Sequence, residues 1–284
     1  MLNYIQLIKP GIIIGNICSM IGGFFLASKG DVHFNLLCFS ILSLSLVIAS
    51  SCIINNILDR DLDQYMHRTK NRLLVVNSKL VTHAIVFSIF LGLFGFLFSY
   101  FFLNNFALII LLIGVIIYVI FYTVLFKRKT VYSTFIGSIA GSMPPLFGYF
   151  TVVHHFDYSS VILFLTFFLW QIPHFYSIGI CRIQDYKKAR IPIFPLIKGI
   201  KLTKIHIMLY ILLFFLFSSM FTYIQLTGKL YFFSNLIFSV LWFFISFLTF
   251  LKSSYCFLLY KILFFCSILV IMNLSIMMSI DYVI

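Results

Sequence analysis

The chain contains a series of unbroken apolar stretches about 20 residues long, and this feature restricts its fold more than any other. An α-helix needs about that length to cross the roughly 30 Å hydrocarbon layer of a bilayer. Of the 284 residues, 62% are hydrophobic and only 10% are charged, whereas a soluble domain carries about 25% charged residues. A soluble core of this size could not bury so much apolar surface, so we expect a membrane protein.

The apolar stretches are expected to form about nine transmembrane helices. Open strands are excluded because unpaired backbone groups are too costly in lipid. A β-barrel would show short alternating segments in place of long apolar runs. The sequence therefore predicts an all-α polytopic membrane protein, with a single bundle and a single domain over residues 1–284. The expected spans are 10–28, 36–57, 82–101, 106–126, 131–152, 158–180, 205–226, 230–251 and 261–280.

The basic residues predict the orientation of the bundle. If the N-terminus is cytoplasmic, every Lys and Arg except Lys29 and Lys229 falls on the cytoplasmic side. Such an excess is the positive-inside signal, so we expect a cytoplasmic N-terminus and a periplasmic C-terminus. The net charge of +13 does not indicate a nucleic-acid partner, because the basic residues lie in short segments between apolar spans without interleaved aromatic residues.

The acidic residues are few, and three polar residues near the end of the second span form a pattern. Asn55, Asp59 and Asp63 repeat every four residues, so a helix continuing past the membrane surface would place them on one face. Two carboxylates at this spacing repel each other, and a cation would offset that repulsion. Magnesium is usually held by one or two carboxylates together with substrate phosphates. The pattern therefore predicts a magnesium site.

Two arginines follow this pattern directly. Arg68 and Arg72 share a helical spacing and could make bidentate contacts with phosphate oxygens. Carboxylates for a metal beside guanidinium groups for an anion indicate a diphosphate substrate. The alternative is a solvated charged loop that obeys the positive-inside rule. The acidic residues outside these cytoplasmic segments are expected to be solvated in loops or at the terminus: Asp31, Asp157 and Asp281.

A second group of residues closes the sixth span and carries a resemblance to a known family. Trp170–Tyr176 ends the span, and a lone Asp185 follows it. Together with Asn55-x-x-x-Asp59-x-x-x-Asp63, this resembles the intramembrane aromatic prenyltransferase superfamily, and within it the protohaem IX farnesyltransferase (haem O synthase) family. The motifs that carry the closer resemblance are Met66-x-Arg68-Thr69-x-x-Arg72, Lys127-Arg128-Lys129-Thr130-Val131-Tyr132, Gly137-Ser138-x-x-Gly141-x-x-Pro144-Pro145, Trp170-Gln171-x-Pro173-His174-Phe175 and Asp185-Tyr186 with Ile191-Pro192-x-x-Pro195.

The resemblance implies a reaction and a set of site residues. The reaction is transfer of a farnesyl group from farnesyl diphosphate to a vinyl group of haem b, with addition of water, to give haem O; Mg²⁺ is the cofactor. The resemblance assigns catalysis and metal–diphosphate binding to Asn55, Asp59, Asp63 and Asp185. It assigns the diphosphate or the haem propionates to Arg68, Arg72, Lys127 and Lys187. His174 is either a ligand of haem iron or a packed core histidine.

Two other functions remain open at this stage. A sister enzyme could prenylate a quinone precursor such as a hydroxybenzoate, using the same diphosphate half of the site. A transporter without catalysis would more typically carry its ionisable groups at mid-membrane. We expect a multi-pass protein of the bacterial cytoplasmic (inner) membrane, with the active site facing the cytoplasm, because no added transit segment is recognised. The expected partners are the two substrates and lipid; the sequence does not identify a protein partner such as a terminal oxidase.

Overall fold

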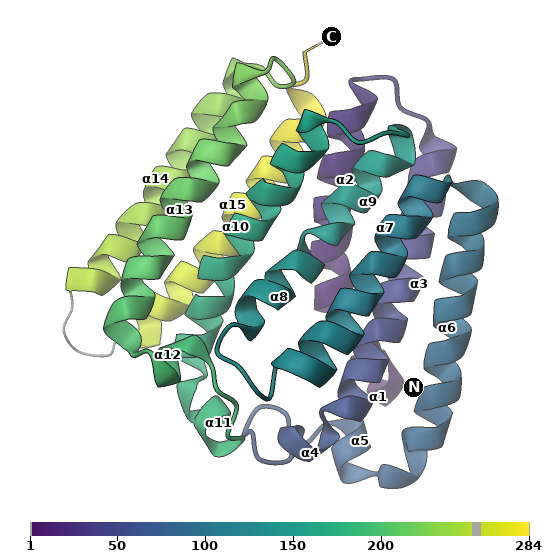
Figure 1. The fold of residues 1–284 in the computed structure, drawn as a ribbon, viewed down its shortest axis with the longest axis vertical. Helices are drawn as coiled ribbons and strands as arrows, with labels where there is room; N and C mark the ends of the chain where they lie inside the picture. Colours follow the sequence, from purple (N-terminus) through teal and green to yellow (C-terminus); the bar gives the residue numbers. More distant parts are fainter. Residues whose placement is uncertain (1, 252–256, 284) are drawn as a thin grey trace.

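The computed structural model describes residues 2–251 and 257–283, and its regular structure is helical (Figure 1). The long helices are α2 (Pro10–Ser28), α3 (Phe34–Leu58), α6 (Val81–Phe102), α7 (Asn105–Val115), the π-helix η2 (Ile116–Phe126), α8 (Ser133–Gly141), α9 (Met143–Val152), α10 (Tyr158–Cys181), α13 (Ile200–Tyr223), α14 (Lys229–Leu251) and α15 (Phe257–Ile280). The short ones are α1 (Leu2–Ile8), α4 (Arg60–Asp63), α5 (Leu73–Val76), the 3₁₀-helix η1 (Ser78–Leu80), α11 (Ile183–Lys188) and α12 (Phe194–Ile197).

The prediction of an all-helical membrane bundle is confirmed. In the described ranges, 8 helical segments are long and apolar enough to cross a membrane: α2, α3, η1 with α6, α7 with η2, α10, α13, α14 and α15. The predicted span 131–152 is divided between α8 and α9, each too short to cross alone. The largest shift in boundary is in the seventh span, since α13 begins at Ile200 and ends at Tyr223, whereas 205–226 was predicted.

The break between α8 and α9 has a local cause in the sequence. Pro144 and Pro145 lie in the first turn of α9, where a residue without a backbone N–H is tolerated, but they could not continue the ladder of α8. Every residue of α9 from Met143 to Thr151 is buried. The helix packs closely against α2, where a Cβ at Gly148 would collide with the backbone of Met20. This broken span therefore forms the centre of the bundle.

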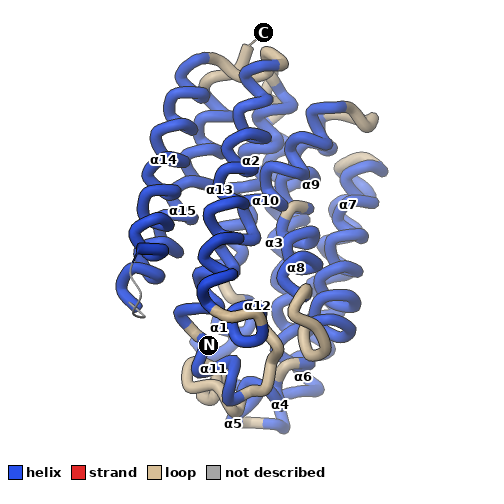
Figure 2. The backbone as a smooth tube through the Cα atoms, turned by 60° about the vertical axis from the view of Figure 1, so that its left-hand side comes forward, coloured by secondary structure: helices blue, strands red, loops and turns tan. Residues whose placement is uncertain are grey.

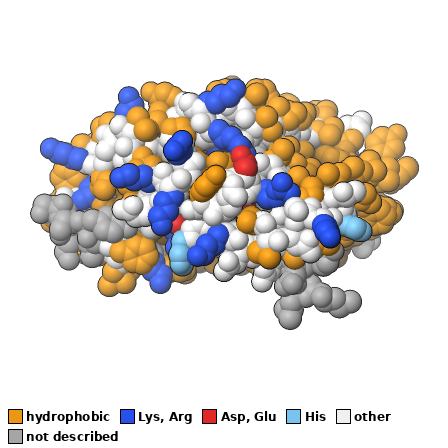
Figure 3. All heavy atoms as spheres, turned by 90° about the horizontal axis from the view of Figure 1, so that it is seen from below, with side chains coloured by type: hydrophobic (Ala, Val, Ile, Leu, Met, Phe, Trp, Pro, Cys, Tyr) orange, Lys and Arg blue, Asp and Glu red, His pale blue; other side chains and the backbone are white. Residues whose placement is uncertain are grey.

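The bundle has one end rich in basic side chains. The short helices α1, α4, α5, α11 and α12 gather at this end, and the two chain termini lie at opposite ends (Figures 1 and 2). Seen from this end, the surface carries Lys and Arg side chains over most of its width (Figure 3). Exposed basic residues here include Arg60, Arg68, Lys70, Arg182, Lys187 and Lys188. Lys252, also expected on this side, lies outside the described residues.

Two of the three acidic residues expected to be solvated have structural roles at the opposite end. The Asp157 carboxylate caps α10 by accepting from the Ser160 backbone N–H at 2.8 Å and from the Tyr149 hydroxyl at 2.5 Å. Asp281 accepts from the Tyr231 backbone N–H at 2.6 Å, near the start of α14. The expectation of simple solvation was wrong for both. It was right for Asp31, whose side chain is 89% exposed.

The close contact between α2 and α9 yields a stability prediction. Gly148→Val would force side-chain atoms into the α2 backbone, and overpacking of this kind costs about 1–3 kcal/mol or more. We expect a clear fall in the melting temperature of the purified protein in detergent. Gly11→Ala is the control, because a Cβ at Gly11 has no atom within 4 Å. A Gly148→Val protein as stable as the Gly11→Ala protein would contradict this packing.

Candidate functional site

The predicted stripe of Asn55, Asp59 and Asp63 forms where α3 ends. The helix stops at Leu58, and Asp59 (φ −90°, ψ 3°) joins it to α4. The backbone still makes i→i−4 hydrogen bonds through the junction, from Asp59 to Asn55 at 2.9 Å and from Asp63 to Asp59 at 2.8 Å. The three side chains therefore share one face, although the helix is not continuous. All three residues are buried, with 5%, 2% and 4% exposure in sequence order.

Each buried carboxylate has a basic partner. The Lys127 ammonium, directly after η2, forms an ion pair with Oδ2 of Asp59. The Arg72 guanidinium contacts Oδ2 of Asp63 at 2.5 Å. A buried carboxylate without such a partner would lose several kcal/mol of hydration, and these pairs offset that cost. With Asn55, whose amide donates to Asp59 at 2.8 Å, the structure thus brings together five residues that the sequence assigned to the site.

Lys9 is a member of the cluster that sequence reasoning missed. Its ammonium donates to Oδ1 of Asn55 at 2.7 Å from the residue that precedes α2. Burial, with the nearby charges of Arg72 and Lys127, lowers the pKa of Lys9 to about 8. In the sequence, Lys9 looked like any other basic residue at the membrane surface. Only the approach of the start of α2 to the end of α3 distinguishes it.

A more exposed ion pair flanks the cluster. The Arg128 guanidinium holds the Asp61 carboxylate with two hydrogen bonds of 2.6 and 2.8 Å, and it also donates to the Leu58 carbonyl at 2.6 Å. The hydrogen bond from Arg128 lowers the pKa of Asp61. The Asp61 side chain is 59% exposed. It lies outside the buried stripe.

The segment between Asp63 and Arg72 differs from the prediction. Arg68 and Arg72 were expected to share a helical face, but residues 64–72 form turns and not a helix. The Thr69 hydroxyl donates to the Asp63 carbonyl at 2.9 Å, which folds the segment back toward the stripe. Arg72 consequently points inward to Asp63, while Arg68 is exposed and makes no ion pair within the described ranges. The helical pairing of the two arginines was wrong.

Asp185 reaches the same end of the bundle from the other half of the chain. Its Oδ1 accepts from the His67 backbone N–H at 3.0 Å, and Met66 packs against Ala189 and Ile191. The two acidic segments therefore meet, although Asp185 binds backbone and does not join Asp59 and Asp63. Lys187 is exposed. In residues 2–251 and 257–283, no group of three or more His, Cys, Asp or Glu side chains is arranged to hold a metal ion.

The stripe nevertheless has the donor chemistry that Mg²⁺ requires. Oδ1 of Asp59 is buried and has no hydrogen-bond partner in the described structure. Asp63 and the amide oxygen of Asn55 add two further oxygen donors on the same face. Mg²⁺ needs only one or two carboxylates when phosphates and waters complete its shell. The residues present therefore fit a magnesium ion that binds together with a phosphorylated substrate.

His174 lies away from the carboxylates, in the interface of α10 and α15. Its Nδ1 lies 2.7 Å from the Ser267 hydroxyl, and its ring stacks on Trp170 with the centroids 4.8 Å apart. The Ser267 hydroxyl hydrogen is already donated to the Phe264 carbonyl at 2.5 Å. Nδ1 must therefore be the donor to Ser267, which leaves Nε2 of the neutral ring with a free lone pair.

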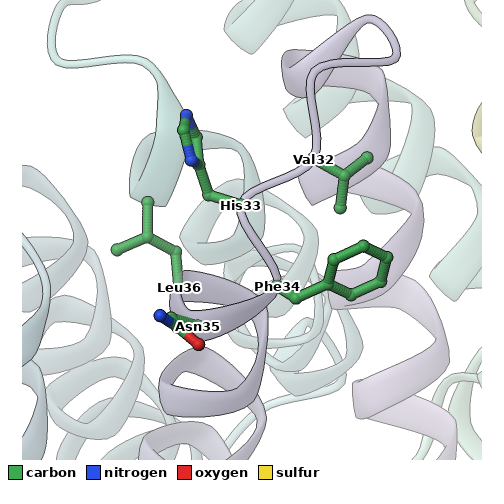
Figure 4. A pocket seen from close by; sticks show the side chains of 5 residues that line it. All are labelled: Val32, His33, Phe34, Asn35 and Leu36. Carbon is green, nitrogen blue, oxygen red and sulfur yellow. The ribbon is translucent and has the colours of Figure 1, made fainter.

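A hollow lined by Val32, His33, Phe34, Asn35 and Leu36 lies at the opposite end of α3 (Figure 4). The part of α3 between Leu36 and Asn55 separates it from the stripe by about 28 Å at 1.5 Å per residue. No acidic or basic side chain other than His33 lines it. The hollow therefore has no part in the carboxylate chemistry.

Comparison with known proteins agrees with this site. Residues 16–272 match the model of the UbiA prenyltransferase family. The chain is 44% identical over 282 residues to a protoheme IX farnesyltransferase of Blochmanniella floridana, covering 98% of this chain and 96% of the relative. It is 44% identical over 283 residues to a protoheme IX farnesyltransferase of Wigglesworthia glossinidia brevipalpis, covering 99% and 98%. The resemblance inferred from the motifs is confirmed.

Solved structures share the fold. A digeranylgeranylglyceryl phosphate synthase aligns with a TM-score of 0.78 at 21% identity, covering 98% of both chains. A UbiA homolog from Aeropyrum pernix K1 aligns with a TM-score of 0.75 at 16% identity, covering 93% of this chain and 97% of the other. A UbiA homolog from Archaeoglobus fulgidus bound to GPP and Mg²⁺ aligns with a TM-score of 0.65 at 14% identity, covering 98% and 100%. The helical arrangement is thus that of UbiA homologs.

The buried Lys127–Asp59 pair and the exposed Arg128–Asp61 pair predict different losses of stability on mutation. Lys127→Met leaves the Asp59 carboxylate buried without its main partner, which should destabilise the protein by about 3 kcal/mol. Arg128→Gln removes the partner of the exposed Asp61 and only a more distant contact with Asp59, 3.9 Å from its Oδ1, so it should cost less, about 1 kcal/mol. Thermal unfolding in detergent, in the absence of substrate and divalent cations, measures both. Equal losses in the two variants would show that Asp59 does not depend on Lys127.

Proposed function

We propose that this chain, which belongs to the UbiA prenyltransferase family, transfers a farnesyl group from farnesyl diphosphate to a vinyl group of haem b and forms haem O. The observation that carries the proposal is the 44% identity, over nearly the whole length of both chains, to protoheme IX farnesyltransferases. The site agrees with this reaction, because its buried carboxylates and cations lie at the polar end of an apolar bundle. Farnesyl diphosphate is likewise a polar anion joined to an apolar chain, so its two parts match the charged cluster and the apolar interior.

The diphosphate is assigned to the cluster around Asp59 and Asp63. Mg²⁺ held by Asn55, Asp59 and Asp63, with Asp185 closing the site from the second segment, would stabilise the charge that develops on the leaving diphosphate. Lys127, Arg72 and Lys9 contact the acidic stripe, so they would lie beside a phosphate that binds a metal held there. We infer that they turn from the protein oxygens to the phosphate oxygens when the substrate binds.

The reaction can be written with its atoms balanced. The bond between farnesyl C1 and its oxygen breaks, and diphosphate leaves with the electron pair. A new carbon–carbon bond joins farnesyl C1 to the terminal carbon of the haem vinyl group. Water then adds its hydroxyl to the other vinyl carbon and releases a proton. The protein must exclude bulk water from the farnesyl cation until the carbon–carbon bond forms, and the apolar interior of the bundle suits this task.

His174 is proposed as the residue that binds haem iron. A ligating histidine usually donates its second ring N–H to an oxygen, which fixes the ring and its tautomer. His174 meets this description, because Nδ1 donates to Ser267 and Nε2 makes no hydrogen bond to the described residues. The exposed Arg68 and Lys187 at the basic end are proposed to contact the haem propionates or the diphosphate.

We propose that the basic end faces the cytoplasm of a bacterial cell, with the chain in the cytoplasmic membrane. The support is the concentration of Lys and Arg at this end and the opposite placement of the termini (Figures 1 and 3). The substrate site then opens on the side where a water-soluble diphosphate is available. Cysteine labelling with a membrane-impermeant reagent in whole cells tests the orientation. A cysteine introduced within residues 64–72 that is labelled from outside the cell would contradict this orientation.

Activity assays test the proposed reaction and the acidic stripe. Purified protein incubated with haem b, farnesyl diphosphate and Mg²⁺ should yield haem whose mass has increased by one farnesyl group and one hydroxyl group. Asp59→Asn and Asp63→Asn should each lower the rate at least about a hundredfold, since each removes charge from the site that binds the metal and diphosphate. Asp61→Asn is the control and should keep most of the activity. The absence of farnesylated haem from folded wild-type protein would refute the function.

The absorption spectrum of bound haem tests His174. His174→Ala should shift the Soret band of haem b added to the purified protein, because the iron loses its imidazole ligand. His206→Ala is the control, since His206 packs against Phe194 and Tyr210 and is not proposed as a ligand. An unchanged spectrum in the His174→Ala protein would favour a packing role for this histidine.

A further inference from the structure

The segment between α7 and Lys127 is wound as a π-helix over 11 residues, far longer than the single-turn π-bulges that proteins usually contain. Its winding shows in the i→i−5 hydrogen bond from the Lys127 backbone N–H to the Tyr122 carbonyl at 2.9 Å. π-Helical segments occur frequently at functional sites. Here the segment runs directly into Lys127, the partner of Asp59.

The winding changes which residues face the site. Ile109 and Ile116 are 50% and 44% exposed, and they lie seven residues apart, which is about two turns of α-helix. Continuing that α-helical spacing would place Thr123 on the same outward face. It would place Lys127 there as well, because Lys127 follows Ile116 by about three turns. In the structure, however, Thr123 is 1% exposed and Lys127 meets Asp59. The slower π-helical winding is what turns both residues inward.

Thr123 contacts a residue of the acidic stripe. Its hydroxyl donates to the Tyr118 carbonyl, five residues earlier, at 2.8 Å. With its hydrogen used there, the Thr123 oxygen can only accept from the Asn55 amide nitrogen at 3.3 Å. The same amide nitrogen donates to Oδ2 of Asp59 at 2.8 Å. Both N–H bonds of the Asn55 amide are therefore occupied.

This arrangement fixes the direction of the Asn55 amide. Because Asp59 and Thr123 take the two N–H groups, the nitrogen and oxygen of the amide cannot exchange places, and the oxygen stays where it accepts from the Lys9 ammonium at 2.7 Å. We propose that Thr123 is a positioning residue, which the π-helix brings to Asn55 so that the amide oxygen faces the cation of the site. Without the Thr123 acceptor, one N–H of Asn55 would be buried and unpaired. Rotation of the amide would then compete with cation binding.

The inference rests on the proposed function, since it assigns the cation to Mg²⁺ with a prenyl diphosphate, but its test does not require the acceptor. Mn²⁺ replaces Mg²⁺ as a probe, and its binding is followed by electron paramagnetic resonance in the presence of a farnesyl thiodiphosphate that does not react. Thr123→Val keeps the shape of the side chain and removes the hydroxyl. Thr123→Ser keeps the hydroxyl. Val124→Thr, at a residue that is 46% exposed, is the matched control on the lipid face.

Thr123→Val should weaken Mn²⁺ binding about tenfold, the change expected when a buried N–H loses its acceptor. The Mg²⁺ concentration needed for turnover should rise in parallel, while the KM for haem stays the same. Thr123→Ser should restore Mn²⁺ binding, and Val124→Thr should not change it. If Thr123→Val does not accumulate in membranes, Thr123→Ala replaces it. Alanine also lacks the hydroxyl, so the same loss of Mn²⁺ affinity is expected.

Two results would overturn the inference. One is wild-type Mn²⁺ affinity in the variants that lack the hydroxyl. The other is an equal loss in Thr123→Val and Thr123→Ser accompanied by a raised KM for haem, which would indicate a general packing defect. The result of the Mn²⁺-binding experiment is independent of the result of the haem assay. Wild-type protein that fails to farnesylate haem would refute the proposed function, whereas weaker Mn²⁺ binding in Thr123→Val would still support the role of Thr123.

Discussion

The carboxylates of Asp59 and Asp63 are buried, and the need to neutralise them organises the polar end of the bundle. Lys127 arrives from the end of η2, and Arg72 arrives from the turns after α4. Each of these segments must end at a defined place for its cation to reach its carboxylate. These protein cations neutralise the acidic stripe. In the proposed reaction, Mg²⁺ and a diphosphate would replace these ion pairs within the protein with one metal–phosphate complex.

The remainder of the bundle provides the apolar environment that such an exchange requires. The broken span of α8 and α9 lies at its centre, and α9 is buried along nearly its whole length. His174 and Trp170 lie on α10, with Ser267 of α15 accepting from the His174 ring. The charged cluster and this aromatic region are held on different helices of one bundle. A reaction that transfers an isoprenoid group from its diphosphate to a porphyrin needs both environments.

Much of this arrangement could be predicted from sequence, for reasons that differ between elements. Long apolar runs predicted the spans because helix length in a bilayer is fixed by hydrocarbon thickness. The spacing of Asn55, Asp59 and Asp63 predicted a shared face, and it survived the break at Asp59 because the i→i−4 hydrogen bonds continue. The π-helix could not be predicted, since η2 is apolar at nearly every position and its sequence has no usable periodicity. Lys9 was missed because only tertiary packing brings it to Asn55.

A crystal structure with Mn²⁺ and unreactive farnesyl thiodiphosphate tests the central claim most directly, because the anomalous signal of Mn²⁺ places the ion independently of the protein. The account predicts Mn²⁺ at direct-ligand distance from Asp59 and Asp63, with the Lys127 ammonium turned from Asp59 to a phosphate oxygen. Mn²⁺ at a different place, with the Lys127–Asp59 and Arg72–Asp63 pairs intact beneath the bound diphosphate, would contradict it.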